Sequence, residues 1–353
     1  MISFYPGPSQ VYRQVPKWVT KAYAEGYLSV NHRSAQFEAL MSQTQTLLRE
    51  NLRIPGDYHC YFTSSATECW EIIAQSLVVS KSAHLFNGAF GRKWYQYTRK
   101  LIPKSQEFVF DSNVVLSPDL LPASHGADLI AITQNETSNG TQVSAGNLQL
   151  MREKLTEPLI AIDVTSSLGG IDLPWEFGDV WFASVQKCLG LPAGMGLLIC
   201  SPRCLQRAEE IGDHQHYNSL LHLDFHMKNH QTTHTPNVLN IYLLNKVLKK
   251  TQSIKSTQKK VELRYNKWLD YLHTLNSLDH LIDNPEVRSH TVIALKGDPR
   301  QVQSIIDCSK ENEIEIGRGY GDLKNTTLRL ANFPALRVKH IKALQKLWSK
   351  MRY

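Results

Sequence analysis

Short apolar runs alternate with segments of helical periodicity over the first two thirds of the chain. Six runs of apolar residues, each ending in polar residues, predict strands at 59–63, 84–87, 128–133, 159–163, 179–183 and 196–200. Continuous apolar runs of this length are typical of strands buried on both faces. A small-residue turn and a helical pattern through residue 77 follow the first run.

The alternation of strands and helices predicts an α/β sheet, whose ligands bind at the carboxyl ends of the strands. The polar residues at those ends are Ser64, Ser65, Asn87, Asn135, Glu136, Thr137, Asp163, Gln186 and Lys187. We therefore expect these side chains to lie close to one ligand site.

The pattern changes at about residue 241. Amphipathic helices are predicted at 240–250, 256–275, 299–310 and 338–351, and strands at 290–295 and 326–330. This pattern indicates a smaller α+β domain after a linking helix. We predict three parts, namely an N-terminal segment near the active site (1–15), a large cofactor-binding domain (16–245) and a small C-terminal domain (246–353).

Composition narrows the classes of protein. The 353 residues are 42% hydrophobic and carry a net charge of +7 that is spread along the chain, which suits small anionic ligands better than nucleic acid. No apolar run reaches the ~18 residues of a membrane span. The first eight residues lack the features of a signal peptide, and the six cysteines form no CxxC pair. We expect a cytoplasmic protein with free thiols and no membrane partner.

One pair of polar residues indicates a particular chemistry. The apolar run at 159–162 ends in Asp163, and the next predicted strand leads to Lys187, with Gly190, Gly194 and Gly196 beyond it. Pyridoxal phosphate (PLP) needs a lysine that bonds to its aldehyde carbon and a carboxylate at its pyridine nitrogen. The alternatives are a surface lysine and an aspartate that caps the next turn.

A candidate phosphate site lies at the start of the first predicted helix. Ser65, Ala66 and Thr67 stand between a strand and that helix, where backbone N–H groups and two hydroxyls would surround an anion. An ordinary helix N-cap also uses serine or threonine, so both interpretations stay open here.

Together these residues resemble the class V aminotransferases, and within that class the phosphoserine aminotransferase branch. The motifs that carry the resemblance are Phe-Tyr-Pro-Gly-Pro-Ser at 4–9, Asn-His-Arg-Ser-Ala-Gln-Phe at 31–37, Asn-Glu-Thr-Ser-Asn-Gly at 135–140, Asp-Val-Thr-Ser at 163–166 and Gln-Lys at 186–187. The resemblance implies the PLP-dependent transferase fold type I, with a mainly parallel seven-stranded sheet and a smaller α+β domain.

The resemblance also implies roles toward the cofactor. Lys187 would bond to it and shuttle a proton, Asp163 would pair with its ring nitrogen, and Thr137 would bind its phenolic oxygen. Phe90 would stack on the ring, with Trp94 as the alternative. The phosphate would be held by Ser65, Ala66, Thr67 and Gln186, and by His234 and Thr235 of a partner subunit, which implies a homodimer with shared active sites.

The substrate would be bound, by the same resemblance, through Ser9, His32, Arg33 and Arg329. Arginine suits carboxylate and phosphate because its planar fork makes bidentate bonds. His32 and Arg33 would act across the dimer on the distal phosphate or side-chain carboxylate.

The chain departs from the phosphoserine branch at 317–324. A Gly-Arg-Gly-Tyr-Gly-Asp-Leu-Lys stretch replaces the expected H-R-x-V-G-G-M-R segment and is closer to the alanine- or serine-glyoxylate branch. Arg318 and Lys324 are candidates for the missing phosphate-binding groups, with a solvated surface charge as the alternative for each. The resemblance as a whole implies a phosphoserine:2-oxoglutarate aminotransferase of serine biosynthesis. The alternatives are an alanine/serine–glyoxylate aminotransferase and, more remotely, a non-catalytic binding protein of this fold.

Histidines crowd residues 214–234. They are His214, His216, His222, His226, His230 and His234. No HExxH motif or strong partner acid accompanies them, so we expect no metal site but a polar loop that borders the active site and the dimer contact.

Overall fold

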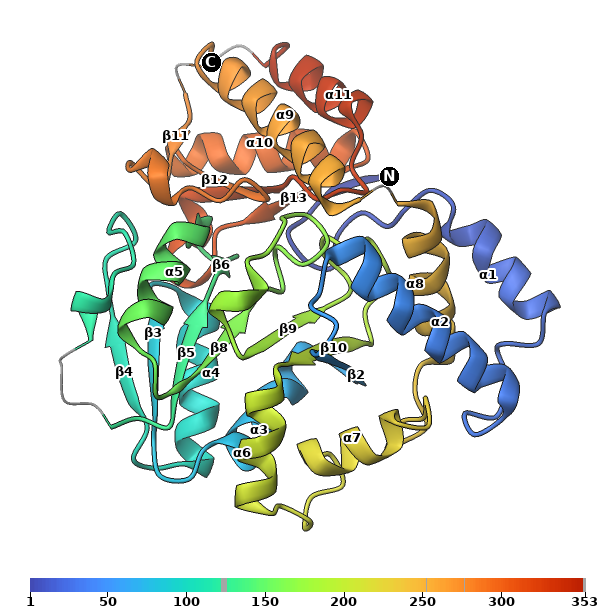
Figure 1. Ribbon diagram of the computed structural model, residues 1–353. Helices are drawn as coiled ribbons and strands as arrows, with labels where there is room; N and C mark the ends of the chain where they lie inside the picture. Colours follow the sequence, from blue (N-terminus) through green and yellow to red (C-terminus); the bar gives the residue numbers. More distant parts are fainter. Residues whose placement is uncertain (122–125, 252, 276, 352–353) are drawn as a thin grey trace.

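The computed structural model describes residues 1–121, 126–251, 253–275 and 277–351. Its two main sheets lie in separate parts of the molecule, with the seven-stranded sheet below the five-stranded sheet in Figure 1. The large sheet has the strand order β2-β10-β9-β8-β5-β3-β4. These strands are β2 (His59–Thr63), β3 (Ser82–Phe86), β4 (Gln106–Val109), β5 (Leu129–Thr133), β8 (Leu159–Asp163), β9 (Val180–Ser184) and β10 (Gly196–Cys200).

The large sheet is mainly parallel. β10 is antiparallel to both of its neighbours, β2 and β9, whereas the pairings among β9, β8, β5, β3 and β4 are parallel. This confirms the predicted α/β fold and the six predicted strands. β4 was not predicted, because this edge strand is largely exposed and so contains no continuous apolar run.

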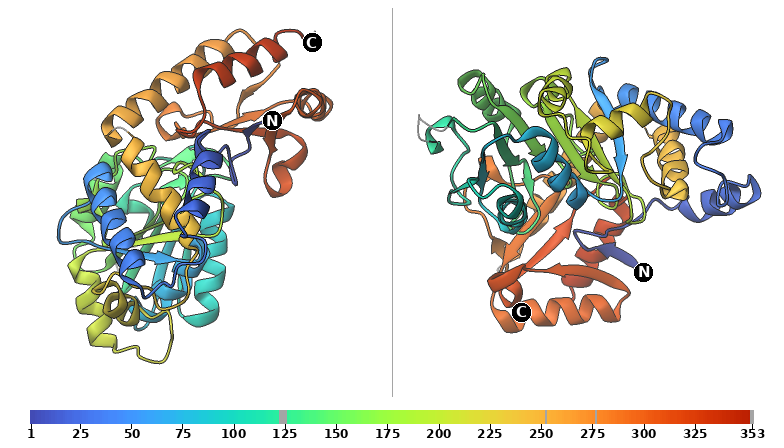
Figure 2. Two further views of the ribbon diagram at one scale, coloured as in Figure 1. Left: turned by 90° about the vertical axis from the view of Figure 1, so that its right-hand side faces the viewer. Right: turned by 90° about the horizontal axis from the view of Figure 1, so that it is seen from below.

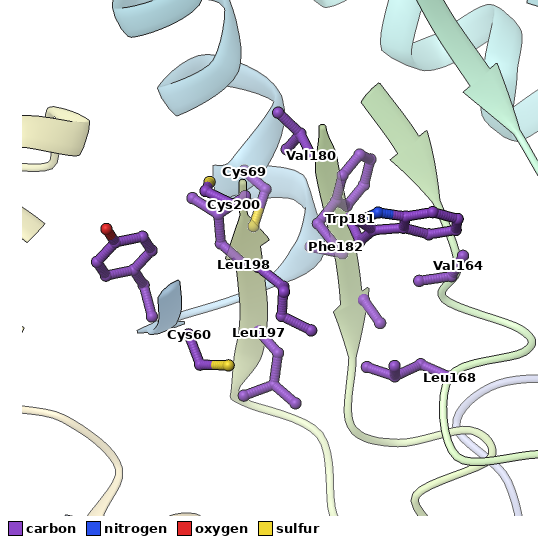
Figure 3. Close-up of a cluster of buried hydrophobic side chains, with 14 of the residues drawn as sticks. Cys60, Cys69, Val164, Leu168, Val180, Trp181, Phe182, Leu197, Leu198 and Cys200 are labelled. Atoms are coloured by element: carbon purple, nitrogen blue, oxygen red, sulfur yellow. The ribbon is translucent and has the colours of Figure 1, made fainter. Parts of the chain in front are cut away.

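The inner strands are buried on both faces because helices cover them. The covering helices include α3 (Ala66–Leu77), α4 (Ala89–Leu101) and α6 (Pro202–Ile211). Figure 3 shows side chains of β9 and β10 packed with Cys69 of α3 and with Val164 and Leu168 from the segment after β8. Burial at this density fixes the ends of the strands, where the ligand-binding residues are expected.

The small sheet has the order β1-β13-β14-β12-β11. Its strands are β1 (Ile2–Phe4), β11 (Asp279–His280), β12 (Val292–Lys296), β13 (Ile314–Arg318) and β14 (Thr327–Ala331). The N-terminal strand β1 pairs in parallel with β13, with Ile2 opposite Ile314. β1, β11 and β13 were not predicted; in β13 the burial alternates between Ile314, Glu315 and Ile316, which gives a weaker signal than a continuous run.

Helices α9 (Ile254–Leu272), α10 (Pro299–Glu311) and α11 (Val338–Trp348) pack on the small sheet. In the left view of Figure 2, α9 and α11 lie on the side of this sheet that faces away from the large sheet. Ile254 at the start of α9 belongs to the large core, whereas Trp268 belongs to the small core. The division into a large and a small domain near residue 245 stays a prediction.

The remaining elements complete the chain. The helices are α1 (Val15–Ala24), α2 (Ala35–Leu52), α5 (Ala145–Lys154), α7 (Leu220–Met227) and α8 (Val238–Lys250), with single turns η1 (Pro118–Leu120), η2 (Trp175–Phe177), η3 (Pro285–Val287) and η4 (Gly321–Asn325). A two-stranded ribbon joins β6 (Asn135–Glu136) to β7 (Thr141–Gln142). Among the described residues, no helix combines the length and the apolar character that crossing a membrane requires.

Candidate active site

A cavity of about 390 Å³ lies where the large sheet, the small sheet and the N-terminal segment meet. It is lined by Tyr5, Pro6, Gly7, Ala66, Thr67, Trp70, Phe90, Lys93, Tyr97, Asn135, Thr137, Asp163, Thr165, Ser184, Gln186, Lys187, Tyr320 and Arg329. Many of these residues follow the carboxyl ends of β5, β8 and β9, where parallel α/β sheets bind their ligands.

Lys187 follows β9 and is only 6% exposed. Its Nζ donates hydrogen bonds to Thr137 Oγ1 at 2.8 Å and to Ser166 Oγ at 3.0 Å. Burial lowers the pKa of Lys187 to about 8, although the nearby carboxylates of Asp163 and Glu136 oppose this shift. A buried amine with a lowered pKa carries the neutral form that a nucleophile or a general base requires.

Asp163 ends β8 and lines the same cavity. Its Oδ1 accepts the Thr165 N–H at 2.8 Å, so it does cap the following turn, as the alternative interpretation held. Burial raises the pKa of Asp163, while the bond from Thr165 and the charge of Lys187 lower it. A cation placed in the cavity would therefore bind to a carboxylate that the protein has desolvated.

The start of α3 supplies the candidate phosphate site. Ser65 caps this helix, since its Oγ accepts the Glu68 N–H at 3.1 Å, and Ser65 does not line the cavity. Ala66 and Thr67 do line it, and the Ala66 N–H donates to Ser184 Oγ at 2.8 Å. The partial positive charge of the helix N-terminus therefore faces the cavity, while the Ser65 hydroxyl has the ordinary N-cap role.

Phe90 forms one wall of the cavity, and Lys187 Nζ lies 5.1 Å from the centre of its ring. The alternative aromatic residue, Trp94, is 1% exposed and packs edge-on against Phe182 in the core, with ring centres 4.9 Å apart. Of the two residues, only Phe90 can stack on a ligand in this cavity.

Glu136 holds Phe90 in place. Its buried carboxylate accepts the N–H groups of Phe90 and Gly91, each at 3.1 Å, and the N–H of Ser138 at 2.9 Å. These bonds satisfy two free N–H groups at the start of α4 and place a negative charge at the positive end of that helix. From the sequence, Glu136 is expected only as one of the polar residues near the ligand site and as part of a motif, with no role of its own.

Arg329 on β14 brings a cation from the small sheet to the cavity. Its side chain is 4% exposed; Nε donates to the Arg318 carbonyl at 2.8 Å, and Nη1 donates to the Thr137 carbonyl at 2.7 Å. Burial lowers its pKa, but a guanidinium stays charged in proteins. Arg318 and Lys324, the sequence-based candidates for extra anion-binding groups, do not line the cavity.

Five predicted site residues also lie outside the cavity lining, namely Ser9, His32, Arg33, His234 and Thr235. The Ser9 N–H donates to the Gln186 carbonyl at 3.1 Å, which ties the N-terminal segment to the turn before Lys187. Arg33 contacts His226 Nδ1 at 3.4 Å and also Gln231. The residues that we expect to act across a dimer therefore lie outside the cavity of their own chain.

The histidine-rich segment holds no metal-type cluster within the described ranges, where no group of three or more His, Cys, Asp and Glu side chains is arranged to bind an ion. His216 pairs with Asp213, and His230 contacts Gln45.

The cavity fits pyridoxal phosphate. It offers a buried amine, a buried carboxylate, an aromatic wall and a helix N-terminus, which match the aldehyde, ring nitrogen, ring face and phosphate of that cofactor. In addition, Thr165 Oγ1 is buried beside Asp163 and has no hydrogen-bond partner within the described chain. Fold and cavity together define a PLP-dependent enzyme of fold type I.

Comparison with known proteins identifies the family. The aminotransferase class-V model matches residues 4–322, so the chain belongs to the class V aminotransferases. It is accordingly a PLP-dependent transaminase.

Its relatives include several phosphoserine aminotransferases. The protein of that name from Corynebacterium glutamicum is 30% identical over 256 residues, which are 69% of this chain and 64% of the relative. The one from Rhodococcus opacus is 26% identical, and the match covers 96% of this chain and 92% of the relative. The crystal structure of a phosphoserine aminotransferase from Cytophaga hutchinsonii is 29% identical with a TM-score of 0.94, covering 100% of this chain and 99% of that one.

An alanine–glyoxylate aminotransferase from Nostoc sp. shares the fold, with a TM-score of 0.81 at 20% identity over 98% of this chain and 95% of that chain. This likeness extends to the fold alone.

Proposed function

We propose that the protein transfers an amino group between phosphoserine and 2-oxoglutarate, giving 3-phosphohydroxypyruvate and glutamate, as a step of serine biosynthesis in the cytoplasm. One observation carries the proposal: Thr137 holds Lys187 and Arg329 next to each other. Its hydroxyl accepts a hydrogen bond from the Lys187 amine, and its backbone carbonyl accepts one from the Arg329 guanidinium. The likeness to phosphoserine aminotransferases supports the choice of substrate.

The side chains divide the chemistry among them. The bound cofactor supplies the electron sink for the reaction. Lys187 Nζ would remove the proton from Cα of the substrate and deliver it to the former aldehyde carbon of the cofactor, and Thr137 and Ser166 fix the position of that nitrogen. Arg329 binds the α-carboxylate, and its buried guanidinium makes two bonds to backbone carbonyls that restrict its orientation. Asp163 stabilises positive charge at the ring nitrogen of the cofactor.

We further propose a homodimer with shared active sites. His32, Arg33, His234 and Thr235 lie outside the cavity of their own chain. Partial burial lowers the pKa of His32, and the nearby Arg33 and His234 lower it further. Such a cluster is suited to bind anions in the cavity of a second copy. Mixing Lys187→Ala with Arg33→Ala subunits should restore part of the activity that each variant alone has lost; no restoration at any mixing ratio would contradict sharing.

The substrate is tested by half-reactions. The purified enzyme with bound PLP is mixed singly with phosphoserine, glutamate, alanine and serine, and absorbance follows conversion of the cofactor to its amine form. Rapid conversion by phosphoserine and glutamate alone is expected. The stretch at 317–324 favours a second candidate, an alanine/serine–glyoxylate aminotransferase. Conversion by alanine or serine, but not by phosphoserine, would establish that candidate instead.

A further inference from the structure

Lys93 is a third cation on the wall of the active-site cavity. Among the residues that line the cavity in the described structure, the basic ones are Lys93, Lys187 and Arg329, and the acidic one is Asp163. Lys187 and Asp163 are assigned to the cofactor and Arg329 to the α-carboxylate of the substrate. Lys93 therefore has no role in the proposed reaction so far.

The position of Lys93 is set by helix geometry. It lies three residues after Phe90 on α4, so both side chains emerge on the same side of the helix, toward the cavity. Lys93 Nζ lies 5.9 Å from the centre of the Phe90 ring. The ammonium group is thus placed next to the wall on which the cofactor ring would stack.

Lys93 also contacts Tyr320, which lies between β13 of the small sheet and η4. Its Nζ donates a hydrogen bond to Tyr320 Oη and lies 5.1 Å from the centre of that ring. Tyr320 packs on Phe90 with ring centres 5.5 Å apart, and the Arg329 guanidinium lies 5.7 Å from the Tyr320 ring on the small-sheet side. Tyr320 therefore lies next to both Lys93 and the group that binds the α-carboxylate.

Two of the cations that the sequence suggested for a distal anion, Arg318 and Lys324, are directed elsewhere, and the other two candidates, His32 and Arg33, would act only in the cavity of a second copy. Arg318 Nη2 donates to Gln303 on α10 at 2.7 Å, and only the backbone carbonyl of Arg318 faces Arg329. Lys324 is exposed on η4 and does not line the cavity. Of the lysine and arginine residues that line the cavity in the described chain, Lys93 is the one that has no assigned ligand and can bind a second anionic group.

We propose that Lys93 and Tyr320 bind the distal anionic group of the substrate, namely the phosphate of phosphoserine and the side-chain carboxylate of glutamate. The phenol oxygen accepts from the ammonium, so its own O–H is directed away from Lys93 as a donor. Two donors, one of them charged, then face one anion. The inference rests on the proposed function and specifies the part of the site that recognises the distal group.

The test compares substrates with and without a distal anion. Values of kcat/KM are measured for phosphoserine, glutamate and alanine with wild type, Lys93→Met and Lys93→Arg. Losing a charged hydrogen bond should lower kcat/KM of Lys93→Met about 10- to 100-fold for phosphoserine and glutamate, through KM, and leave alanine within about twofold. Lys93→Arg should recover most of the loss because it keeps the charge.

Two further variants sharpen the test. Lys100→Met is the matched control, because Lys100 lies two turns further along the same side of α4, over Tyr97 and outside the cavity lining. It should leave all three substrates unchanged. Tyr320→Phe removes only the hydroxyl and should lower kcat/KM for the two anionic substrates by about 3- to 10-fold.

The outcomes separate this inference from the proposed function. A wild-type enzyme that converts glutamate but not phosphoserine refutes the proposed function, and the glutamate-to-alanine ratio still tests Lys93. A wild-type enzyme that converts phosphoserine, with Lys93→Met leaving the substrate ratios unchanged, refutes the inference. An equal loss for alanine and phosphoserine also refutes it, because that loss indicates general damage to the site.

Discussion

Replacing Glu136 should both destabilise the fold and weaken binding of the cofactor. The carboxylate is 1% exposed and accepts three backbone N–H groups, those of Phe90, Gly91 and Ser138. Glu136→Ala leaves these three donors without this acceptor, at a cost of about 1–3 kcal/mol for each. The expected loss of about 3–9 kcal/mol is a large fraction of the ~5–15 kcal/mol by which proteins are stable.

Glu136→Gln removes the negative charge of the side chain and keeps its size and shape. The amide keeps one oxygen that can accept one set of N–H groups, but its NH₂ group then faces another donor. We expect a loss of about 1–3 kcal/mol, smaller than that of alanine. Ser138→Ala is the comparison variant, because it keeps the Ser138 N–H that donates to Glu136 and removes the hydroxyl, which donates to Glu136 and accepts the Ala89 N–H at 2.9 Å.

The assay has two readouts. Urea unfolding of the apoenzyme, followed by circular dichroism, gives the free energy of unfolding, and titration with PLP, followed by tryptophan fluorescence, gives the Kd. Because Phe90 begins α4 and forms the cavity wall, both Glu136 variants should raise the Kd more than Ser138→Ala does. Unfolding free energies within about 0.5 kcal/mol of wild type for both variants would refute this account of Glu136.

Three further predictions follow from the same cavity. With a pKa of about 8, Lys187 is about one-tenth neutral at pH 7. The rate of covalent PLP attachment to the apoenzyme, measured by absorbance, should therefore rise about tenfold per pH unit below pH 8 and level off above it. A rate that does not change between about pH 6 and pH 9 would contradict this. Gly7 has a φ of +147°, and an added Cβ would lie 2.8 Å from Lys187 Cε. Gly7→Ala should therefore lower kcat at least about tenfold. Gly26→Ala is the control and should leave kcat unchanged, because Gly26 also has a positive φ but no other described part of the chain lies within 4 Å of the added Cβ. Arg329→Lys should raise KM for every amino-acid substrate by about 10-fold or more, since an ammonium cannot reproduce the bidentate fork; an unchanged KM would remove Arg329 from carboxylate binding.

The inner part of the large sheet could be predicted from the sequence because its strands are buried on both faces. Such strands give continuous apolar runs, and the polar residues that end them, such as Asp163 and Lys187, fall where the structure forms its cavity. Edge strands gave no such signal: β4 is exposed and β13 alternates.

The remaining features depend on contacts between distant segments. Glu136 stabilises the start of α4, whose residues precede it by more than forty positions, and no local pattern records that contact. The contact between Lys93 and Tyr320 likewise joins α4 to the loop after β13, which lies more than two hundred residues later in the chain. Ser65 shows the opposite case, because its bond to the Glu68 N–H follows from a local helix-capping rule; its role toward a phosphate stays a prediction.

The pairing of β1 with β13 joins two strands that are synthesised far apart in time. The strand at Ile2–Phe4 precedes its partner at Ile314–Arg318 by about 300 residues, which at 5–20 residues per second is a delay of roughly 15–60 s. During that interval the nascent chain can form the large sheet, but Arg329 is not yet available to line the cavity beside Lys187. A chain that has not reached Arg329 therefore lacks a finished catalytic chamber, and turnover should begin only after β14 has been synthesised.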